Sequence, residues 1–274
     1  MQTPDPKFDL DVFFARVRTA ATRVLMLDYD GTLAPFRINP AEAVPYPGVI
    51  PMLDEIQQAG HTRVVMVSGR WTKDLVPLLG LKHTPEIWGS HGWERLQQHG
   101  EYNVGRISPS ALEVLVAADE WIAEIEALGG RCERKPAALA FHWRGLDNAR
   151  IAAIRDKIFE KWMDFGHANG LAWHDFDGGI ELRAAGHDKG DVVRTLVAEA
   201  GPGAVFAYLG DDLTDEPAFQ TMPEGDAAIL VRPQFRPTAA ALWIRPPEEL
   251  LEFLARWHRD AGKSLCAGSS GRGL

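Results

Sequence analysis

Short apolar runs that each end in a polar loop recur along this chain, and segments with a helical pattern separate them. Residues 24–27, 64–67 and 205–209 are runs of this kind. Such runs are typical of parallel strands that are buried on both faces. Because these strands alternate with helical segments, the sequence predicts an α/β fold whose core is a doubly wound, mostly parallel sheet with helices on both faces.

This alternation is interrupted in the middle of the chain. Outside the interruption we expect a short helix ending near residue 79, other helices at 7–21, 47–59, 188–200 and 246–260, and further strands at 86–89, 228–231 and 242–244. Inside it we expect helices at 109–128 and 147–167 and strands at 131–133, 137–143, 171–174 and 179–183. Short turns join these strands, which favours an antiparallel sheet. The prediction is a core at 1–102 and 185–260, an inserted α+β cap domain at 103–184, and a disordered tail rich in Gly and Ser at 261–274.

The charge balance limits the partners of this chain. Its 274 residues carry a formal net charge of −9, and no run of Lys and Arg offers the basic surface that nucleic-acid binding requires. The N-terminal segment is acidic rather than apolar, and no stretch reaches the roughly 20 apolar residues of a membrane span. Cys132 and Cys266 are expected to be two reduced thiols. We expect a cytoplasmic monomer with no nucleic-acid or membrane partner.

Two carboxylates follow the first apolar run. Asp28 lies at the predicted carboxyl end of that strand, where function gathers in sheets of this type, and Asp30 lies two residues further on. Close carboxylates repel each other, and a hard cation such as Mg²⁺ relieves that repulsion. One of them can then attack phosphorus while the other protonates the leaving oxygen. The alternative is a solvated acidic turn, since Asp and Gly are common in turns.

Two further segments offer partners for a phosphate. Ser68, Gly69 and Arg70 follow the second apolar run, where a hydroxyl and backbone N–H groups can hold phosphate oxygens at a helix start. The alternative for Ser68 is an ordinary helix cap. Lys189 opens the helix after the interruption, where its charge can balance carboxylates and a phosphate, although most lysines are solvated.

The loop after the run at 205–209 is strongly acidic. It carries Asp211, Asp212, Asp215 and Glu216 within six residues. Capping of the following helix explains one or two of these acids, because negative charge is favourable at a helix N-terminus. A metal site explains the others.

These segments, in this order, resemble the four motifs of the haloacid dehalogenase superfamily of phosphatases, a resemblance that spans roughly residues 24–231. The resemblance implies Asp28 as the nucleophile, Asp30 as the acid and base, and Lys189 as the catalytic cation. It implies that Mg²⁺ is bound by the Asp28 and Asp211 carboxylates and the Asp30 carbonyl, with Asp215 ordering metal-bound water. It places the phosphate-binding residues at Thr32, Ser68, Gly69 and Arg70.

Several longer runs resemble the trehalose-6-phosphate phosphatase family within this superfamily. They are the segment 209–216, the runs Gly89-Ser90-His91-Gly92 and Glu181-Leu182-Arg183, and the cap segments 133–135 and 141–144. The resemblance implies that the disaccharide is bound by Glu133, Lys135, His142, Arg144 and Glu181. The alternative for these residues is a charged outer face of a cap strand. His91 either supports the junction of core and cap or is a structural histidine.

The expected activity is hydrolysis of trehalose 6-phosphate to trehalose and phosphate through an aspartyl-phosphate. The core motifs leave three alternatives open. The first is a phosphatase for another sugar phosphate, such as sucrose phosphate or a glycosyl-glycerate phosphate. The second is a phosphosugar mutase, and the third is a non-catalytic sugar-phosphate sensor, against which the intact acidic residues argue.

Overall fold

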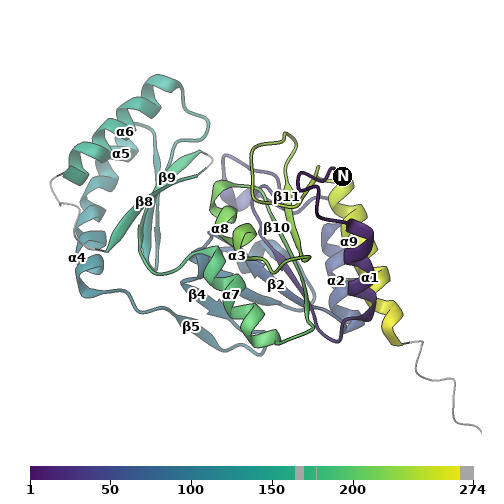
Figure 1. The fold of residues 1–274 in the computed structure, drawn as a ribbon. Helices are drawn as coiled ribbons and strands as arrows, with labels where there is room; N and C mark the ends of the chain where they lie inside the picture. The colour runs from purple at the N-terminus through teal and green to yellow at the C-terminus, as the bar shows by residue number, and fades with distance from the viewer. Residues whose placement is uncertain (164–169, 177, 266–274) are drawn as a thin grey trace, which may run out of the picture. The chain divides into compact units, whose positions relative to one another are not determined.

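The chain divides into two compact units in a computed structural model that describes residues 1–163, 170–176 and 178–265 (Figure 1). The core unit comprises Met1–Glu101 together with Asp188–Leu274, and the cap unit comprises Tyr102–His187. The cap unit is therefore an insertion between two parts of the core unit. No helix of the described residues is long and apolar enough to cross a membrane.

The strands of the core unit belong to an eight-stranded sheet with the order β12-β11-β10-β1-β2-β3-β4-β5. The strands are parallel from β12 to β3, and β4 is antiparallel to β3. This confirms the predicted α/β fold with a mostly parallel sheet. The strand bounds are β1 Arg23–Leu27, β2 Arg63–Val67, β3 Glu86–Gly89, β4 Glu94–Leu96, β5 Tyr102–Val104, β10 Val205–Gly210, β11 Ala227–Val231 and β12 Leu242–Ile244.

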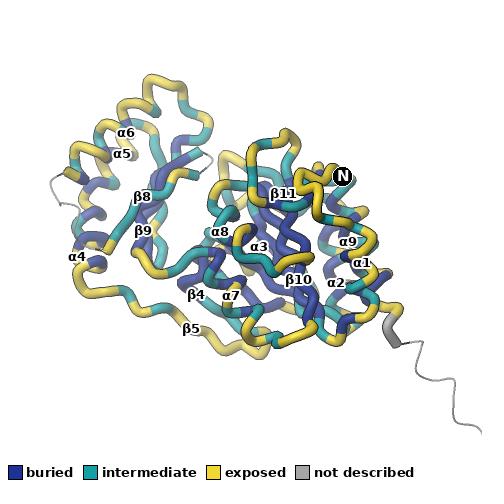
Figure 2. The backbone as a smooth tube through the Cα atoms, in the orientation of Figure 1, coloured by how far each residue is buried: buried dark blue, intermediate teal, exposed yellow. Residues whose placement is uncertain are grey.

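Helices cover both faces of this sheet. Residues Leu25 and Leu27 of β1 pack against helices α1, α2, α3 and α9, whereas Val24 and Met26 pack against α7 and α8. The core strands are buried throughout β1, β10 and β11 (Figure 2). The helix bounds are α1 Leu10–Thr19, α2 Val49–Ala59, α3 Thr72–Leu79, α7 Lys189–Ala200, α8 Glu216–Thr221 and α9 Glu248–Ala261, with 3-10 turns at Pro40–Glu42, Ser90–Gly92 and Leu213–Asp215.

The short strands β4 and β5 were not predicted from the sequence. Strand β4 has little apolar character, and ion pairs fasten it to its neighbours. Arg95 donates hydrogen bonds to Glu86 of β3 at 2.9 Å and to Glu199 of α7 at 2.7 Å. All residues of β5 are exposed. Contacts between distant residues, rather than a local apolar pattern, therefore determine this edge of the sheet.

The cap unit packs helices on one side of a separate antiparallel sheet, as predicted for an α+β cap (Figure 1). The sheet has the order β6-β7-β9-β8, with bounds β6 Arg131–Lys135, β7 Ala138–His142, β8 Leu171–Phe176 and β9 Gly179–Ala184. The helices are α4 Pro109–Ala118, α5 Ile122–Ala127 and α6 Asn148–Met163. A 3-10 turn at Asp119–Trp121 divides the single helix predicted at 109–128.

The two faces of the cap sheet differ in character. Leu139, Phe141, Ile180 and Leu182 lie on the face that packs against the helices. The strand register puts Glu133 opposite Ala140, Ala140 opposite Glu181, and Glu181 opposite His174. Because side chains alternate along a strand, this row lies on the other face. We call that face the polar face; its positions are 131, 133, 135, 138, 140, 142, 172, 174, 176, 179, 181 and 183.

The C-terminal boundary differs from the prediction of a disordered tail beginning at residue 261. Ala261 is the last residue of α9, is buried in the core, and is followed by a 3-10 turn at Gly262–Leu265. The Lys263 ammonium lies 3.4 Å from the buried Asp260 carboxylate, which extends the ordered end. Cys132 is a free thiol. The remainder of the predicted tail, Cys266, the predicted helical residues 164–167 and the predicted turn residue Asp177 lie outside the described residues.

Candidate active site

The ends of three adjacent strands bring the main candidate residues to one edge of the core sheet. Strand β1 lies between β10 and β2, and the Asp28 N–H donates to the Leu209 carbonyl at 2.9 Å. Asp28, Ser68 and Asp211 follow these strands and are 3%, 1% and 3% exposed. The polar residues that the sequence placed at strand ends are therefore buried at a common edge, as expected of a site in this fold class.

A buried ion pair joins Lys189 to this edge. Its Nζ lies 2.7 Å from Asp28 Oδ1 and 2.7 Å from Asp215 Oδ1. Lys189 is the first residue of α7, where Asp188 caps the helix and forms a reciprocal capping box with Asp191. Helix α7 covers the face of the sheet toward which the even-numbered residues of β1 point, and Asp28 continues that series. The helix start therefore delivers one buried cation to the candidate nucleophile.

The pKa of Asp28 reflects competition between burial and charge. Burial raises the pKa of Asp28 to about 7, although the Lys189 ammonium lowers it in part. Burial alone would lower the pKa of Lys189, but the Asp215 and Asp28 carboxylates together raise it above its usual value. Lys189 therefore stays charged at neutral pH.

We expect the metal-free protein to lose stability as the pH rises from about 4 to about 7. Asp28 has a pKa of about 7 in the folded protein against 3.8 without the fold, so the folded state binds the extra proton within this window. Stability falls with pH wherever the folded state binds more protons. Denaturant unfolding in EDTA across this range measures the slope. Asp28→Asn should reduce it, whereas the contribution of buried Asp226, whose pKa burial raises to about 6, should remain.

The Asp215 carboxylate accepts several hydrogen bonds that hold the acidic loop. Its Oδ1 accepts hydrogen bonds from Lys189 and from the Tyr208 hydroxyl, each at 2.7 Å. Its Oδ2 accepts from the N–H groups of Asp211 at 3.1 Å and Asp212 at 3.0 Å. A carboxylate offers about four acceptor positions, so these donors fill them. Asp215 can therefore reach a cation through water more readily than directly.

Asp211 has the opposite character. Among the described residues, none donates a hydrogen bond to its buried carboxylate. Burial and the nearby Asp28 and Asp215 carboxylates raise the pKa of Asp211 well above its usual value. The Asp211 side chain lies against Gly31, where an added Cβ would stand 2.1 Å from Oδ2, and the φ of +82° at Gly31 also favours glycine.

The three carboxylates form a group that suits a hard cation. Ligand oxygens of Asp28, Asp211 and Asp215 lie within 4.8 Å of one another. Lys189 supplies one positive charge against three buried carboxylates, and Asp211 has an unused acceptor. Mg²⁺ prefers oxygen ligands and one or two carboxylates, so the donor set fits this ion.

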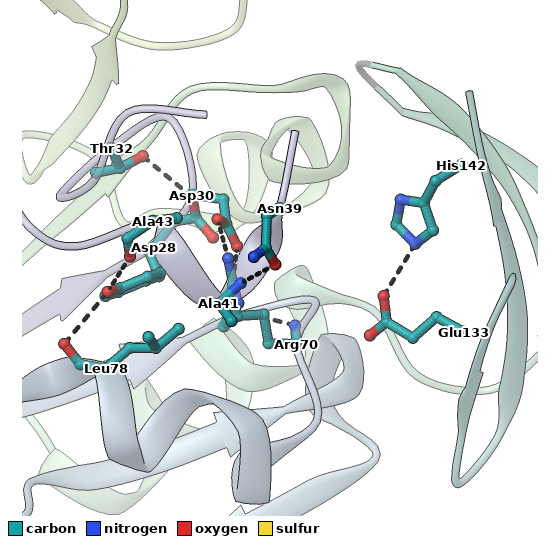
Figure 3. A network of polar contacts seen from close by, with 12 residues as sticks. Asp28, Asp30, Thr32, Asn39, Ala41, Ala43, Arg70, Leu78, Glu133 and His142 are labelled. Carbon is teal, nitrogen blue, oxygen red and sulfur yellow. Dashed lines mark hydrogen bonds and ion pairs between the residues drawn. The ribbon is translucent and has the colours of Figure 1, made fainter. Parts of the chain in front are cut away.

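Asp30 has its own counter-charge. The Arg70 Nε and Nη2 each donate to an Asp30 oxygen at 2.6 Å, a bidentate pair (Figure 3). The Arg70 guanidinium also lies 5.4 Å from the centre of the Tyr29 ring. The sequence argument that Asp28 and Asp30 need a shared cation therefore applies to Asp28, because an arginine already neutralises Asp30.

The remaining core candidates lie around the same strand ends. The Thr32 hydroxyl donates to Asp28 Oδ2 at 3.1 Å, and Ser68 Oγ accepts from the Arg70 N–H at 3.1 Å. An added Cβ at Gly69 would stand 2.6 Å from the His91 ring. The His91 N–H donates to the Ser68 carbonyl at 3.0 Å from a backbone with a φ of 58°. His91 therefore supports the loop that carries Ser68 and Gly69.

Predicted sugar-binding residues of the cap unit contact one another on the polar face. Lys135 Nζ donates to Glu181 Oε1 at 2.8 Å. Figure 3 shows the second contact, in which His142 Nε2 lies 2.9 Å from Glu133 Oε2. Burial alone would raise the pKa of Glu133, but Lys135 and His142 lower it below its usual value. Arg144 follows β7 and lies against Gly178, where an added Cβ would stand 3.1 Å from its guanidinium.

Several site residues escaped prediction. On the polar face, the Arg183 guanidinium lies 3.2 Å from His174 Nδ1 and 3.5 Å from Glu181 Oε2. The two-residue spacing of Glu181 and Arg183 was a usable signal, because it puts both side chains on one face of a strand. Tyr208 carried a weaker signal, a hydroxyl within an apolar strand.

Comparison with known proteins gives a consistent result. The model of the family described as trehalose-phosphatase matches residues 26–239. A trehalose-phosphate phosphatase of Mycobacterium marinum is 30% identical over 251 residues, which cover 87% of this chain and 62% of that protein. A bifunctional trehalose-6-phosphate synthase/phosphatase of Thermoproteus tenax is 30% identical over 215 residues, which cover 78% of this chain and 29% of that protein. The chain thus spans less than two thirds of the length of these relatives.

Solved structures share the fold. The C-terminal domain of a trehalose-6-phosphate phosphatase from C. albicans superimposes with a TM-score of 0.76 at 22% identity, covering 94% of this chain and 99% of that one. A protein related to trehalose-6-phosphate phosphatase gives a TM-score of 0.67 at 24% identity, covering 86% of this chain and 97% of that one. At these identities the likeness is one of fold.

Proposed function

This chain belongs to the trehalose-phosphatase family, and from that premise we propose that it is a magnesium-dependent phosphatase that hydrolyses trehalose 6-phosphate to trehalose and phosphate. The family confirms the resemblance inferred from the motifs. The names of the relatives support the substrate, and the geometry of the strand ends supports the reaction.

One observation carries the proposal. Lys189 bridges Asp28 and Asp215 at 2.7 Å each, beside a buried Asp211 carboxylate to which no described residue donates a hydrogen bond. A structural ion pair would match its charges one to one, whereas this group sets three buried carboxylates against one ammonium, and burying an uncompensated charge is costly. Such an arrangement suits a site that receives a cation together with an anionic substrate.

We propose that Asp28, Asp211 and the Asp30 carbonyl hold the metal and that Asp215 orders one of its waters. The bound Mg²⁺ would neutralise phosphate oxygens and make the phosphorus more electrophilic. Lys189, already charged and held by two carboxylates, would bind a further phosphate oxygen. Thr32, Ser68 and the Gly69 and Arg70 N–H groups would complete the phosphate site.

The chemical steps then fall to two carboxylates. An Asp28 oxygen forms a bond to phosphorus as the bond from phosphorus to the sugar oxygen breaks, and Asp30 gives that oxygen a proton. Asp30 next takes a proton from water, which attacks the aspartyl-phosphate and releases phosphate and the free Asp28 carboxylate. In this structure Arg70 donates to both Asp30 oxygens, so one of these hydrogen bonds has to open before a protonated Asp30 can reach the sugar oxygen.

The polar face of the cap sheet supports a sugar as the non-reacting part of the substrate. Glu133 and Glu181 offer carboxylate acceptors to sugar hydroxyls, and Lys135 and His142 offer donors. Between them on β7 lie Ala138 and Ala140, whose small side chains add no polar group to this row. We propose Glu133, Lys135, His142, Arg144 and Glu181 as the sugar-binding residues.

Glu133→Ala is expected to raise the KM for trehalose 6-phosphate by about tenfold or more, because it removes a charged hydrogen-bond partner worth about 1.5–3 kcal/mol. The KM for para-nitrophenyl phosphate, which has no sugar, should change little. Steady-state kinetics on both substrates measures this. Glu124→Ala is the matched control, since Glu124 is a cap glutamate that pairs with Lys161 on the surface. Equal KM changes for both substrates would contradict the assignment of Glu133.

The function itself is tested by measuring phosphate release from a panel of sugar phosphates, with Mg²⁺ and with EDTA. We expect release from trehalose 6-phosphate that requires Mg²⁺. Faster phosphate release from sucrose phosphate or a glycosyl-glycerate phosphate would identify that compound, instead of trehalose 6-phosphate, as the substrate. Isomerised product with little phosphate would indicate a mutase, and binding without turnover would indicate a sensor. The monomeric state and cytoplasmic location expected from the sequence stay predictions.

A further inference from the structure

Two arginines donate hydrogen bonds to backbone carbonyl groups of the acidic loop. Both lie in the segment between β11 and β12, outside every motif of the sequence. The Arg236 Nε donates to the Asp211 carbonyl at 3.3 Å, and its Nη2 donates to the Asp212 carbonyl at 2.7 Å. The Arg232 Nη1 donates to the Asp211 carbonyl at 3.3 Å. These contacts fasten the loop that carries Asp211 to a separate segment of the core unit.

Glu216 completes the attachment. Its Oε1 accepts hydrogen bonds from Arg236 Nη1 and from the Thr238 hydroxyl, the latter at 2.8 Å, and its Oε2 accepts from the Ala239 N–H at 2.8 Å. The side chains of Arg236 and Glu216 are 15% and 18% exposed. A largely buried pair with several hydrogen bonds holds its geometry better than a surface pair does.

These contacts fix the backbone of Asp211. Its N–H donates to Asp215 and its carbonyl accepts from the two arginines, so both of its peptide groups are fixed. Its carboxylate lies close to two others, with ligand oxygens of Asp28, Asp211 and Asp215 within 4.8 Å of one another. A loop free to move would turn this carboxylate away from the others. The two guanidinium groups hold the backbone and place positive charge behind it.

We propose that Arg236, held by Glu216, is a positioning residue that keeps the Asp211 carboxylate directed at the metal site before the metal binds. The inference rests on the metal site of the proposed function. Groups that orient metal ligands commonly contribute 10- to 100-fold to metal affinity. Arg236 touches neither substrate nor metal in this proposal, and acts through the backbone of Asp211.

The test is a calorimetric titration of Mn²⁺, as a probe for the Mg²⁺ site, into the whole protein without substrate. Arg236→Ala should weaken Mn²⁺ binding by about 10- to 100-fold. The Mg²⁺ concentration for half-maximal activity should rise by a similar factor, while kcat at saturating Mg²⁺ stays near wild type. Arg95→Ala is the matched control, because Arg95 is likewise a core-unit arginine paired with glutamate, and its hydrogen bonds go to Glu86 and Glu199, which lie outside the acidic loop. It should leave Mn²⁺ affinity unchanged.

Two milder variants keep the test valid if Arg236→Ala does not fold. Glu216→Gln removes the charge that holds Arg236, and should weaken Mn²⁺ binding, whereas Arg236→Lys should retain part of the affinity. A lowered melting temperature with unchanged Mn²⁺ affinity in the folded variants would overturn the positioning role and leave the proposed function intact. Absence of Mn²⁺ and Mg²⁺ binding by the wild-type protein would overturn the metal site and this inference together.

Discussion

Asp28→Asn is expected to lower turnover of trehalose 6-phosphate by roughly 10⁴-fold or more, as removal of a nucleophile does in other enzymes. The amide is close in size to the carboxylate, so the packing of a residue that is 3% exposed should survive. An amide oxygen is a poor nucleophile and cannot form the aspartyl-phosphate. Single-turnover assays with trapping of acid-stable, base-labile phosphoprotein measure the loss directly.

The control for this variant is another buried carboxylate. Asp54 of α2 is 8% exposed and accepts a hydrogen bond from the Lys82 N–H at 2.9 Å. Asp54→Asn should retain turnover even if it costs stability. Near-normal activity of Asp28→Asn, with a melting curve like that of the wild type, would refute Asp28 as the nucleophile.

Lys189→Met should lower both activity and stability. The substitution keeps an unbranched side chain but removes the one ammonium that contacts Asp28 and Asp215. Removing one partner from a buried ion pair typically costs about 3–5 kcal/mol, since the other charge is left uncompensated. Denaturant unfolding in EDTA at neutral pH should show this loss, and turnover should fall because the phosphate loses a cation.

A surface lysine provides the comparison. Lys157 pairs with Glu160 at 2.8 Å near the surface, so Lys157→Met should cost much less stability than Lys189→Met. Added Mg²⁺ should recover part of the stability of Lys189→Met, because a second cation can neutralise the same carboxylates. Equal losses in the two variants would mean that Lys189 is an ordinary structural lysine.

The sequence predicted the parts of the fold that depend on local pattern. The apolar runs before Asp28, Ser68 and Asp211 became the central strands, because a strand buried on both faces must be apolar along its whole length. The cap strands followed from their short turns and alternating residues. In each case the sequence of a single segment was enough to predict the strand.

What escaped prediction depends on contacts between distant segments. The sequence argument attributed the excess acids of the loop at 211–216 to a metal. In the structure, Glu216 pairs with Arg236, and Asp215 accepts hydrogen bonds from four donors. Among the described residues, no donor bonds to the Asp211 carboxylate. No local sequence pattern predicts that an arginine about twenty residues later will pair with a given acid. For the same reason, the pairing of Asp30 with Arg70 was not foreseen.

In the cap sheet, neighbouring positions of one strand serve different purposes: one packs against the helices and the next belongs to the polar face. On β9, Ile180 and Leu182 pack against the helices, whereas Glu181 and Arg183, which alternate with them, belong to the polar face. A substitution at an odd-numbered position of this strand changes the chemistry of the polar face while the apolar packing stays as it was. The cap unit can therefore change its polar face without rebuilding its apolar core, provided that buried partners such as Lys135 and Glu181 change together.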